Sequence, residues 1–271
     1  MTEIDNKSTV TFESSLHVGD DENEGSSDFE VYLIDEMAKA EASGHFWFTS
    51  RLALIEDVLL RYVPFGDSLL DIGAGTGYVA SYIQSLGYQI SVGDITQKGL
   101  DFAVKAGIDR CYLMDIYKPP FKNKFHAITL FDVIEHLDKD QLALYNVGVM
   151  LKQGGKVLIT VPAHEWLWNK HDELAGHKRR YTMNSLRVKV ELSGLKVVYS
   201  SYIFRSLVPF LWMRSLLGNK LYSSSKISSN GLFVINPVVN KILTWLCVVE
   251  RRLGKFLPNV AGGSILLVAE K

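Results

Sequence analysis

Three glycines separated by single residues follow an apolar segment in the first third of the chain. The apolar segment carries Asp71 and continues into Gly73, Gly75 and Gly77. Glycine lets the backbone turn tightly and approach a ligand closely, so this spacing predicts a binding loop. A dinucleotide-binding loop would have its third glycine at position 78, which is Tyr78, and an acid two residues before the first glycine is atypical of pyrophosphate sites. The loop therefore favours a ligand with a cationic amine.

Acidic residues also end three later apolar segments. They are Asp94, Asp115 and Asp132. In an open parallel sheet the carboxyl ends of the strands meet at one edge, where ligands bind, so these side chains and Asp71 are expected to share a crevice. Asp94 could accept hydrogen bonds from ribose hydroxyls and Asp115 from an adenine amino group. Singly, each acid could equally be a turn or helix cap, but together with the glycine loop they predict a cofactor site.

Short apolar strands and helical patterns alternate along the chain, which predicts an α/β fold with a parallel sheet and helices on both faces. The last two strands lack a crossover helix of the usual kind between them, and this favours an antiparallel final strand. The expected strands cover residues 68–72, 88–92, 110–114, 125–131, 156–161, 195–204 and 263–271, and the expected helices cover 29–42, 49–63, 78–86, 97–106, 139–151, 182–192, 204–217 and 239–257.

The composition is that of a globular protein, with 47% hydrophobic and 22% charged residues among 271. Two cysteines, Cys111 and Cys247, lie far apart and lack metal-type spacing, so we expect no disulfide framework and a reducing, cytoplasmic setting. The polar N-terminus has no signal-like apolar segment. Charged or polar residues interrupt the long apolar stretches before they reach the roughly 20 residues of a spanning helix.

Charge and composition divide the chain into four segments. Residues 1–28 are predicted to be a disordered acidic tail, since residues 1–30 contain nine acids and one lysine. Residues 29–204 are the expected core with its N-terminal helices, 205–262 an amphipathic helical insertion, and 263–271 the final strand of the core sheet. From Gly194 onward, ten basic residues outnumber two acidic ones, which suits an anionic partner or simply a basic surface.

Taken in order, these motifs resemble those of class I S-adenosylmethionine-dependent methyltransferases. The resemblance covers about residues 45–204 and the final strand, and the motifs are residues 69–77, 93–94, 114–116 and 131–137. It implies a Rossmann-like sheet of seven mostly parallel strands with an antiparallel last strand. It also implies that the glycine loop and its acid hold the methionine part of the cofactor and that the later acids hold the ribose and the adenine. The expected cofactor-binding residues are Asp71, Gly73, Ala74, Gly75, Gly77, Asp94, Ile95, Asp115, Ile116, Phe131, Asp132 and His136.

A loop at residues 163–181 is rich in histidine, arginine and aromatic side chains. With residues 45–48 and Arg51, it resembles a bacterial subgroup of these enzymes found among cell-envelope glycan and lipid genes. Methyl transfer to a hydroxyl needs an in-line approach and a base, and an imidazole titrates near neutral pH. Arg179 and Arg180 could clamp an anionic group of the substrate. The alternatives are a loop-ordering histidine, bonded for instance to Asp172, and a solvated basic turn. The candidate catalytic residues are His171, His177, Glu135, His136 and Arg180.

Asp132, Glu135, His136 and His177 also resemble the metal-binding set of small-RNA 2′-O-methyltransferases, in which a divalent ion orients the attacking hydroxyl. Ubiquinone-type O-methyltransferases carry a comparable Glu-His pair. Mixed oxygen and nitrogen ligands suit Mg, Mn or Zn. Here Asp132 stands where that set has glutamate, and metal-free methyltransferases carry the same run. The sequence therefore favours a metal-free site, with a divalent metal as the alternative.

The last helical pattern has an apolar side and a basic side. Such a helix can cap the sheet, form a homodimer contact, roof a lipid pocket or lie on an anionic membrane surface. The apolar side consists of Val239, Ile242, Leu243, Leu246, Val249, Leu253, Phe256 and Leu257.

The sequence thus predicts a methyltransferase that uses S-adenosylmethionine to methylate a hydroxyl of a glycan, lipid-linked or secondary-metabolite substrate, with a histidine base in residues 164–181. N- or C-methylation of a small metabolite is the alternative. A catalytically inactive cofactor-binding scaffold is the alternative of another class. The expected partners are the methyl acceptor, an anionic membrane at the inner membrane face or a second copy of the chain, and no nucleic acid.

Overall fold

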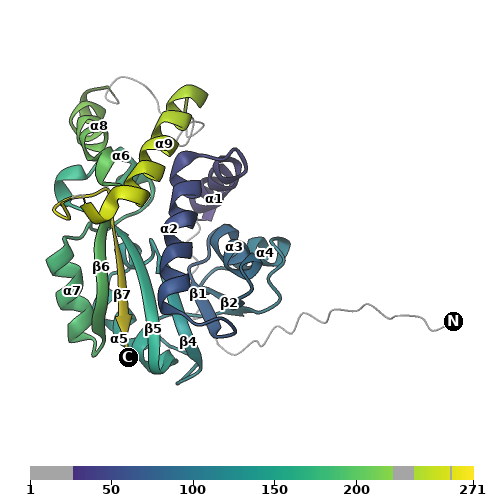
Figure 1. Cartoon of the computed structure of the whole chain (residues 1–271). Coiled ribbons are helices and arrows are strands. Elements are labelled where there is room, and N and C mark those ends of the chain that lie inside the picture. Colours follow the sequence, from purple (N-terminus) through teal and green to yellow (C-terminus); the bar gives the residue numbers. More distant parts are fainter. Residues whose placement is uncertain (1–26, 222–234, 257) are drawn as a thin grey trace.

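The structure is a computed structural model that describes residues 27–221, 235–256 and 258–271 (Figure 1). Most of the expected tail, residues 1–28, lies outside the described residues, and the first helix begins at Ser27. The strands are β1 (Ser68–Ile72), β2 (Gln89–Asp94), β3 (Cys111–Leu113), β4 (Phe125–Phe131), β5 (Leu151–Pro162), β6 (Lys196–Ile203) and β7 (Ser264–Glu270). The longer helices are α1 (Ser27–Ala42), α2 (Phe46–Tyr62), α3 (Tyr78–Ser85), α4 (Gln97–Lys105), α5 (Asp140–Met150), α6 (Lys170–Leu174), α7 (Met183–Leu192), α8 (Val208–Leu221) and α9 (Pro237–Leu253).

The seven strands form one sheet in the order β3-β2-β1-β4-β5-β7-β6. The first five strands in this order are parallel to one another, and β7 is antiparallel to both β5 and β6. The fold class predicted from the sequence is therefore confirmed, including the antiparallel last strand. The chain builds outward from β1 in one direction and from β4 in the other, so the β1–β4 boundary is the point where ligands bind in such sheets.

Two apolar layers enclose the sheet. On one face, residues of α2, α3 and α4 pack into a cluster that α9 joins through Leu243 and Cys247. On the other face, α5 and α7 bury residues such as Val147 and Val190. Because helices cover both faces of the sheet, β7 is buried from Ser264 to Ala269. A strand buried on both faces has a near-continuous apolar sequence, as β7 does.

The insertion between β6 and β7 contains α8 and α9, and both lie at the end of the sheet where the parallel strands terminate (Figure 1). A short 3-10 helix, η3 (Arg205–Leu207), begins the insertion. The buried carboxylate of Glu250 in α9 accepts hydrogen bonds from the backbone N–H of Arg205 at 2.9 Å and of Ser206 at 2.7 Å, and from the Ser206 hydroxyl at 2.7 Å. These bonds fasten α9 to the point where the insertion leaves the sheet.

The amphipathic helix expected at residues 239–257 is present as α9 and the short 3-10 helix η4 (Gly254–Phe256), and only part of its apolar side is buried. Only Leu243, Cys247 and Glu250 of α9 are buried. Four residues of the predicted apolar side, Val239, Ile242, Leu253 and Phe256, are exposed, although α9 contacts both α2 and η3. Leu257 lies outside the described residues.

Replacing Glu250 with alanine is expected to lower the free energy of unfolding by about 2–4 kcal/mol, because three hydrogen bonds to a buried carboxylate are lost and their donors stay buried. Urea unfolding followed by circular dichroism measures the change. The control Glu191→Ala, at an exposed position of α7, should change stability by less than about 0.5 kcal/mol. An equal effect of the two substitutions would contradict the anchoring role of Glu250.

Candidate functional site

The glycine loop joins β1 to α3 and adopts left-handed backbone angles at three positions. The φ angles of Gly73, Gly75 and Gly77 are +75°, +54° and +73°. A Cβ on Gly73 would lie 2.8 Å from a methyl of Val133, and one on Gly77 would lie 2.9 Å from the Cα of Ala103. A Cβ on Gly75 would meet nothing within 4 Å. The outer two glycines therefore serve packing, and the middle one borders open space that a ligand can enter.

Asp94 lies against this loop from the end of β2. Its Oδ1 accepts hydrogen bonds from the backbone N–H and the hydroxyl of Thr96, both at 2.8 Å, and its carboxylate also accepts from the N–H of Ala74 in the glycine loop. Burial raises the pKa of Asp94 although these hydrogen bonds lower it. The next side chain, Ile95, is 66% exposed despite being aliphatic. An acid and an exposed apolar side chain thus stand side by side at the loop.

Asp71 and Asp115 each accept a hydrogen bond from the protein itself. Asp71 is buried, its Oδ1 accepts a 2.6 Å hydrogen bond from Thr129 of β4, and burial raises its pKa to about 6. Asp115 accepts a 2.8 Å hydrogen bond from the backbone N–H of Tyr117, which is the turn-cap role left open above. Ile116 is part of the core.

The side chain of Arg51, from α2, lies next to the carboxyl end of β4. Its Nη1 lies 2.8 Å from Oδ2 of Asp132, and Thr160 donates to Oδ1 of the same carboxylate at 3.1 Å. The guanidinium also lies over the ring of Phe131, 5.7 Å from its centroid. Asp132 adopts a left-handed backbone conformation, with φ of +55°. Sequence reasoning missed this role of Arg51. Because Arg51 already binds the Asp132 carboxylate, a cofactor that contacts Asp132 would share that carboxylate with Arg51.

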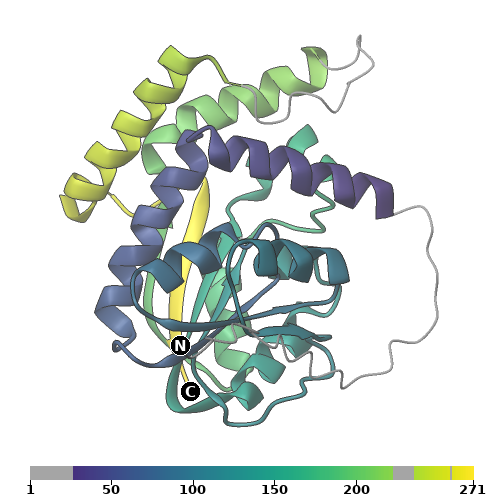
Figure 2. The same ribbon diagram turned by 90° about the vertical axis from the view of Figure 1, so that its right-hand side faces the viewer.

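Glu41 is a second residue that sequence reasoning missed. It accepts a 2.7 Å hydrogen bond from the hydroxyl of Thr76 in the glycine loop, and burial raises its pKa to about 7. Figure 2 shows its helix, α1, running across the end of the sheet above α3 and α4. No local pattern in the sequence indicates a contact between Glu41 and Thr76, because it depends on where α1 is placed.

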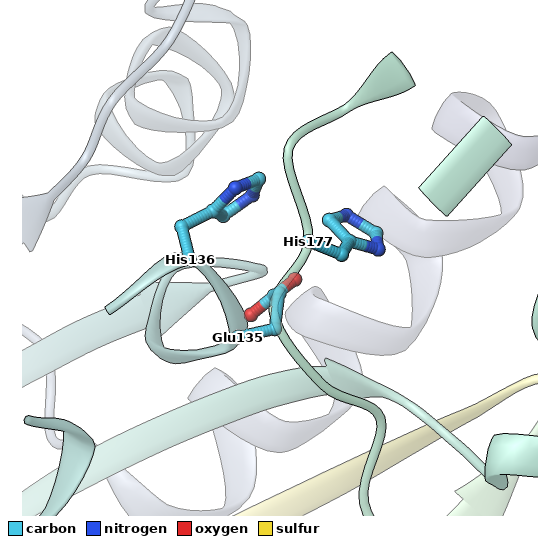
Figure 3. Close-up of side chains that lie close together, drawn as sticks. All are labelled: Glu135, His136 and His177. Carbon is cyan, nitrogen blue, oxygen red and sulfur yellow. The ribbon is translucent and has the colours of Figure 1, made fainter. Parts of the chain in front are cut away.

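Glu135, His136 and His177 come together beside the end of β4 (Figure 3). The first two belong to the 3-10 helix η1 (Ile134–His136), and His177 comes from the loop between α6 and α7. One ligand-type atom from each residue lies within 4.8 Å of the others. The backbone N–H of Lys178 donates to the carbonyl of Glu135 at 2.9 Å, which holds the loop against η1.

Asp172 holds together the loop at residues 163–181 that is rich in histidine and arginine. Its carboxylate receives His177 Nδ1 at 2.8 Å and Nε and Nη2 of Arg180, both at 2.8 Å. Burial raises the pKa of Asp172, but the hydrogen bonds from His177 and Arg180 outweigh it and lower the pKa to about 2. Nη1 of Arg180 donates to the carbonyl of Ala163 at 3.0 Å. Arg180 therefore orders the loop, and its contact with a substrate stays a prediction.

The histidines differ in environment. Burial lowers the pKa of His136 to about 4, with the charge of His177 acting in the same direction. Burial likewise lowers the pKa of His171 to about 4, followed by the charge of Arg214 in α8. His136 and His171 are thus neutral at pH 7. The base role expected of His171 or His177 stays a prediction, while the bond from His177 to Asp172 is the loop-ordering alternative named above.

Known proteins resemble this chain in sequence and in structure. A family model described as a methyltransferase domain matches residues 39–200. The ubiquinone biosynthesis O-methyltransferase of Rickettsia canadensis is 23% identical over 145 residues, which cover 46% of this chain and 61% of that protein. The chain thus spans less than two thirds of the length of the curated relatives it matches.

Two solved structures share the fold. An S-adenosylmethionine-dependent methyltransferase from Thermotoga maritima superposes with a TM-score of 0.54 at 16% identity, over 90% of this chain and 99% of that chain. The phosphoethanolamine N-methyltransferase 2 of Haemonchus contortus, in complex with S-adenosylmethionine, gives a TM-score of 0.51 at 19% identity, over 79% of this chain and 51% of that chain. At these identities the likeness concerns the fold alone.

Arg51→Met is expected to destabilise the chain by about 2–3 kcal/mol. This is less than the ~3–5 kcal/mol of a fully buried pair, because the Asp132 side chain is 25% exposed. The double variant Arg51→Met/Asp132→Asn should recover part of the loss, since the carboxylate without its partner is removed. Urea unfolding measures both, with Arg61→Met at the exposed end of the same helix as control. A single variant as stable as the unsubstituted chain would show that the pair contributes nothing.

Proposed function

Because the chain belongs to the class I S-adenosylmethionine-dependent methyltransferases, we propose that it methylates a hydroxyl oxygen of a glycan, lipid-linked or other secondary-metabolite acceptor. The proposed cofactor site rests mainly on one observation. The carboxylate of Asp94 accepts a hydrogen bond from the N–H of Ala74, next to Gly75, where a Cβ would meet no atom within 4 Å. This contact supports a role for Asp94 as the acceptor of hydrogen bonds from ribose hydroxyls, next to a loop that a ligand can approach closely.

The described residues are suited to this cofactor. Asp94 would bind the ribose, and the exposed face of Ile95 would lie against the adenine, with Asp115 and Ile116 at its edge. The glycine loop would hold the methionine part, and Asp71 would carry the negative charge that favours its amine. The bound cofactor supplies an electrophilic sulfonium methyl. The protein therefore has to orient the acceptor in line with it and accept a proton.

His177 is our proposed base. Its Nδ1 is directed at Asp172, so in the neutral ring the other nitrogen, Nε2, is the proton acceptor, and the carboxylate stabilises the imidazolium that forms. Arg180 and the backbone N–H of Asn169 fix Asp172 in turn. The relatives named for O-methylation in ubiquinone biosynthesis support oxygen as the attacked atom. Methylation of nitrogen or carbon on a small metabolite is the alternative.

Calorimetry should show one S-adenosylmethionine bound per chain, and Asp94→Ala should weaken binding about 10- to 100-fold, the effect of losing hydrogen bonds to a charged group. Asp101→Ala, an exposed acid on α4, is the matched control. Incubation with methyl-labelled cofactor and fractionated glycans and lipid-linked sugars should then yield methyl ethers, identified by mass spectrometry.

Absence of cofactor binding by the folded chain would refute the assignment of the site. N- or C-methylated products would refute the hydroxyl acceptor while leaving the cofactor site intact. Binding without transfer to any fraction would favour the inactive scaffold.

We further propose that α8 and α9 place the enzyme on an anionic lipid surface, where a lipid-linked acceptor would be presented. No described helix is long and apolar enough to cross a membrane. Two helices at the carboxyl end of the sheet, α8 and α9, nevertheless expose large apolar side chains. The basic residues Lys241 and Arg252 of α9 are exposed as well. We call these apolar side chains the outer helical surface: Phe210, Trp212, Met213 and Leu216 of α8, and Val238, Val239, Ile242, Trp245 and Val248 of α9.

The chain is expected to sediment with vesicles that contain anionic phospholipid and to stay in solution with neutral ones. Trp212→Ser/Trp245→Ser should abolish sedimentation, because indole rings contribute much of the apolar area that can enter the lipid interface. Leu192→Ser, at an exposed position of α7, is the control. Recovery of the unsubstituted chain in the supernatant with anionic vesicles would refute the proposal. A dimer that the double tryptophan variant loses would show that this surface binds a second copy instead.

A further inference from the structure

Glu135 is a buried carboxylate that receives no hydrogen bond from another residue in the described part of the chain. Its exposure is 0%, and neither side-chain oxygen has a hydrogen-bond partner. The acids Asp132 and Asp172 stand close enough to add to its negative surroundings. Burial of a polar group without a partner costs free energy, and burial of a charged one costs far more. A bound cation would relieve both costs.

Two imidazoles stand where they could bind the same cation. One ring nitrogen of His136, one of His177 and one oxygen of Glu135 lie within 4.8 Å of one another, and Figure 3 shows the three side chains around a common space. Bonds of about 2.0–2.2 Å to a single ion place its ligands at most about 4.4 Å apart, so a small rotation of one side chain brings all three onto it.

The surroundings of both rings are those of metal-binding histidines. Such histidines direct their second ring nitrogen to a carboxylate or a backbone carbonyl, which fixes the orientation of the ring. His177 directs Nδ1 to Asp172 at 2.8 Å, leaving Nε2 for another partner. His136 is hydrogen-bonded to the backbone of Gly176. Arg180, with two nitrogens on Asp172, holds the outer carboxylate in place.

We infer that Glu135, His136 and His177 bind a divalent transition-metal ion. Two histidines and one carboxylate on one side of an ion leave coordination positions free, and mixed oxygen and nitrogen ligands suit Mn²⁺, Fe²⁺ or Zn²⁺. The binding itself is independent of the reaction.

The role of the ion rests on the proposed function. An acceptor hydroxyl in a free coordination position would lose its proton more readily and would be held toward the cofactor. In the loaded enzyme His177 would then be a ligand instead of the base: the ion would lower the pKa of the bound hydroxyl, and the released proton would pass to solvent water.

The test uses the full chain, stripped with a chelator and titrated with Mn²⁺ while electron paramagnetic resonance measures the free ion. We expect one Mn²⁺ per chain. Glu135→Gln and His177→Gln should each weaken binding at least tenfold and keep the circular dichroism spectrum. The control His126→Gln changes a histidine at the opposite end of β4, next to Asp67 and Ser68, and should leave binding unchanged.

Two results would overturn the inference: no stoichiometric Mn²⁺ or Zn²⁺ binding by the unsubstituted chain, or equal binding by the Glu135 and His177 variants. The titration of the unsubstituted chain decides the matter even if a variant fails to fold. Methyl transfer that persists in excess chelator, by a chain that binds no ion, would reject the metal and leave the proposed methyltransferase with His177 as base. Failure of the folded, unsubstituted chain to bind S-adenosylmethionine would instead count against the proposed function.

Discussion

Carboxylates crowd the carboxyl ends of β1 and β4, and the positive charge of Arg51 stands among them. It pairs directly with Asp132. Burial raises the pKa of Glu41, Asp71 and Glu135, and the charge of Arg51 opposes that rise. Like charges at short range in a poorly solvated site repel strongly, so this cluster of acids needs a cation fixed at its centre. Because Arg51 belongs to α2, the positive charge reaches the site only if that helix packs correctly on the sheet.

Buried acids also connect other segments of the chain to one another. Asp172 gathers His177 and Arg180, and Glu250 receives the start of the insertion. Asp140 of α5 binds the Tyr181 hydroxyl at 2.8 Å and Lys189 of α7 at 2.8 Å. Each carboxylate therefore links segments that are distant from it in the chain or that would otherwise be loose. The loop beside the site is thus held by hydrogen bonds to charged groups as well as by the burial of Ala163, Leu167 and Tyr181 in the core.

Much of the sheet could be predicted from the sequence because its signals are local. Apolar runs, the glycine spacing and the acids at the ends of the first four strands are recognised within a few residues, and the resulting strands differ from the expected ones only at their bounds. The antiparallel β7 followed from the absence of a crossover helix. Asp94 was likewise found because its position depends only on the end of its own strand.

The contacts that shape the site could not be predicted in this way. Arg51 meets Thr160 across 109 positions of sequence, and Glu41 meets Thr76 only because α1 crosses the glycine loop. Side-chain pairing of this kind depends on how whole elements pack, which no period of 3.6 or 2 residues encodes. The packing of α9 stayed open for the same reason: periodicity shows that a helix has an apolar face, but it does not show how much of that face is buried against the rest of the chain.

The place where the insertion joins the sheet has an evolutionary consequence. Ile203 at the end of β6 pairs with Ser264 at the start of β7, so a long excursion leaves and re-enters at adjacent positions of an antiparallel hairpin. Lengthening such a connection is inexpensive in chain entropy, about 0.6 kcal/mol for each doubling. The excursion can thus gain, lose or exchange helices without disturbing the register of the sheet. A cofactor-binding framework of this design can acquire new acceptors by remodelling one hairpin.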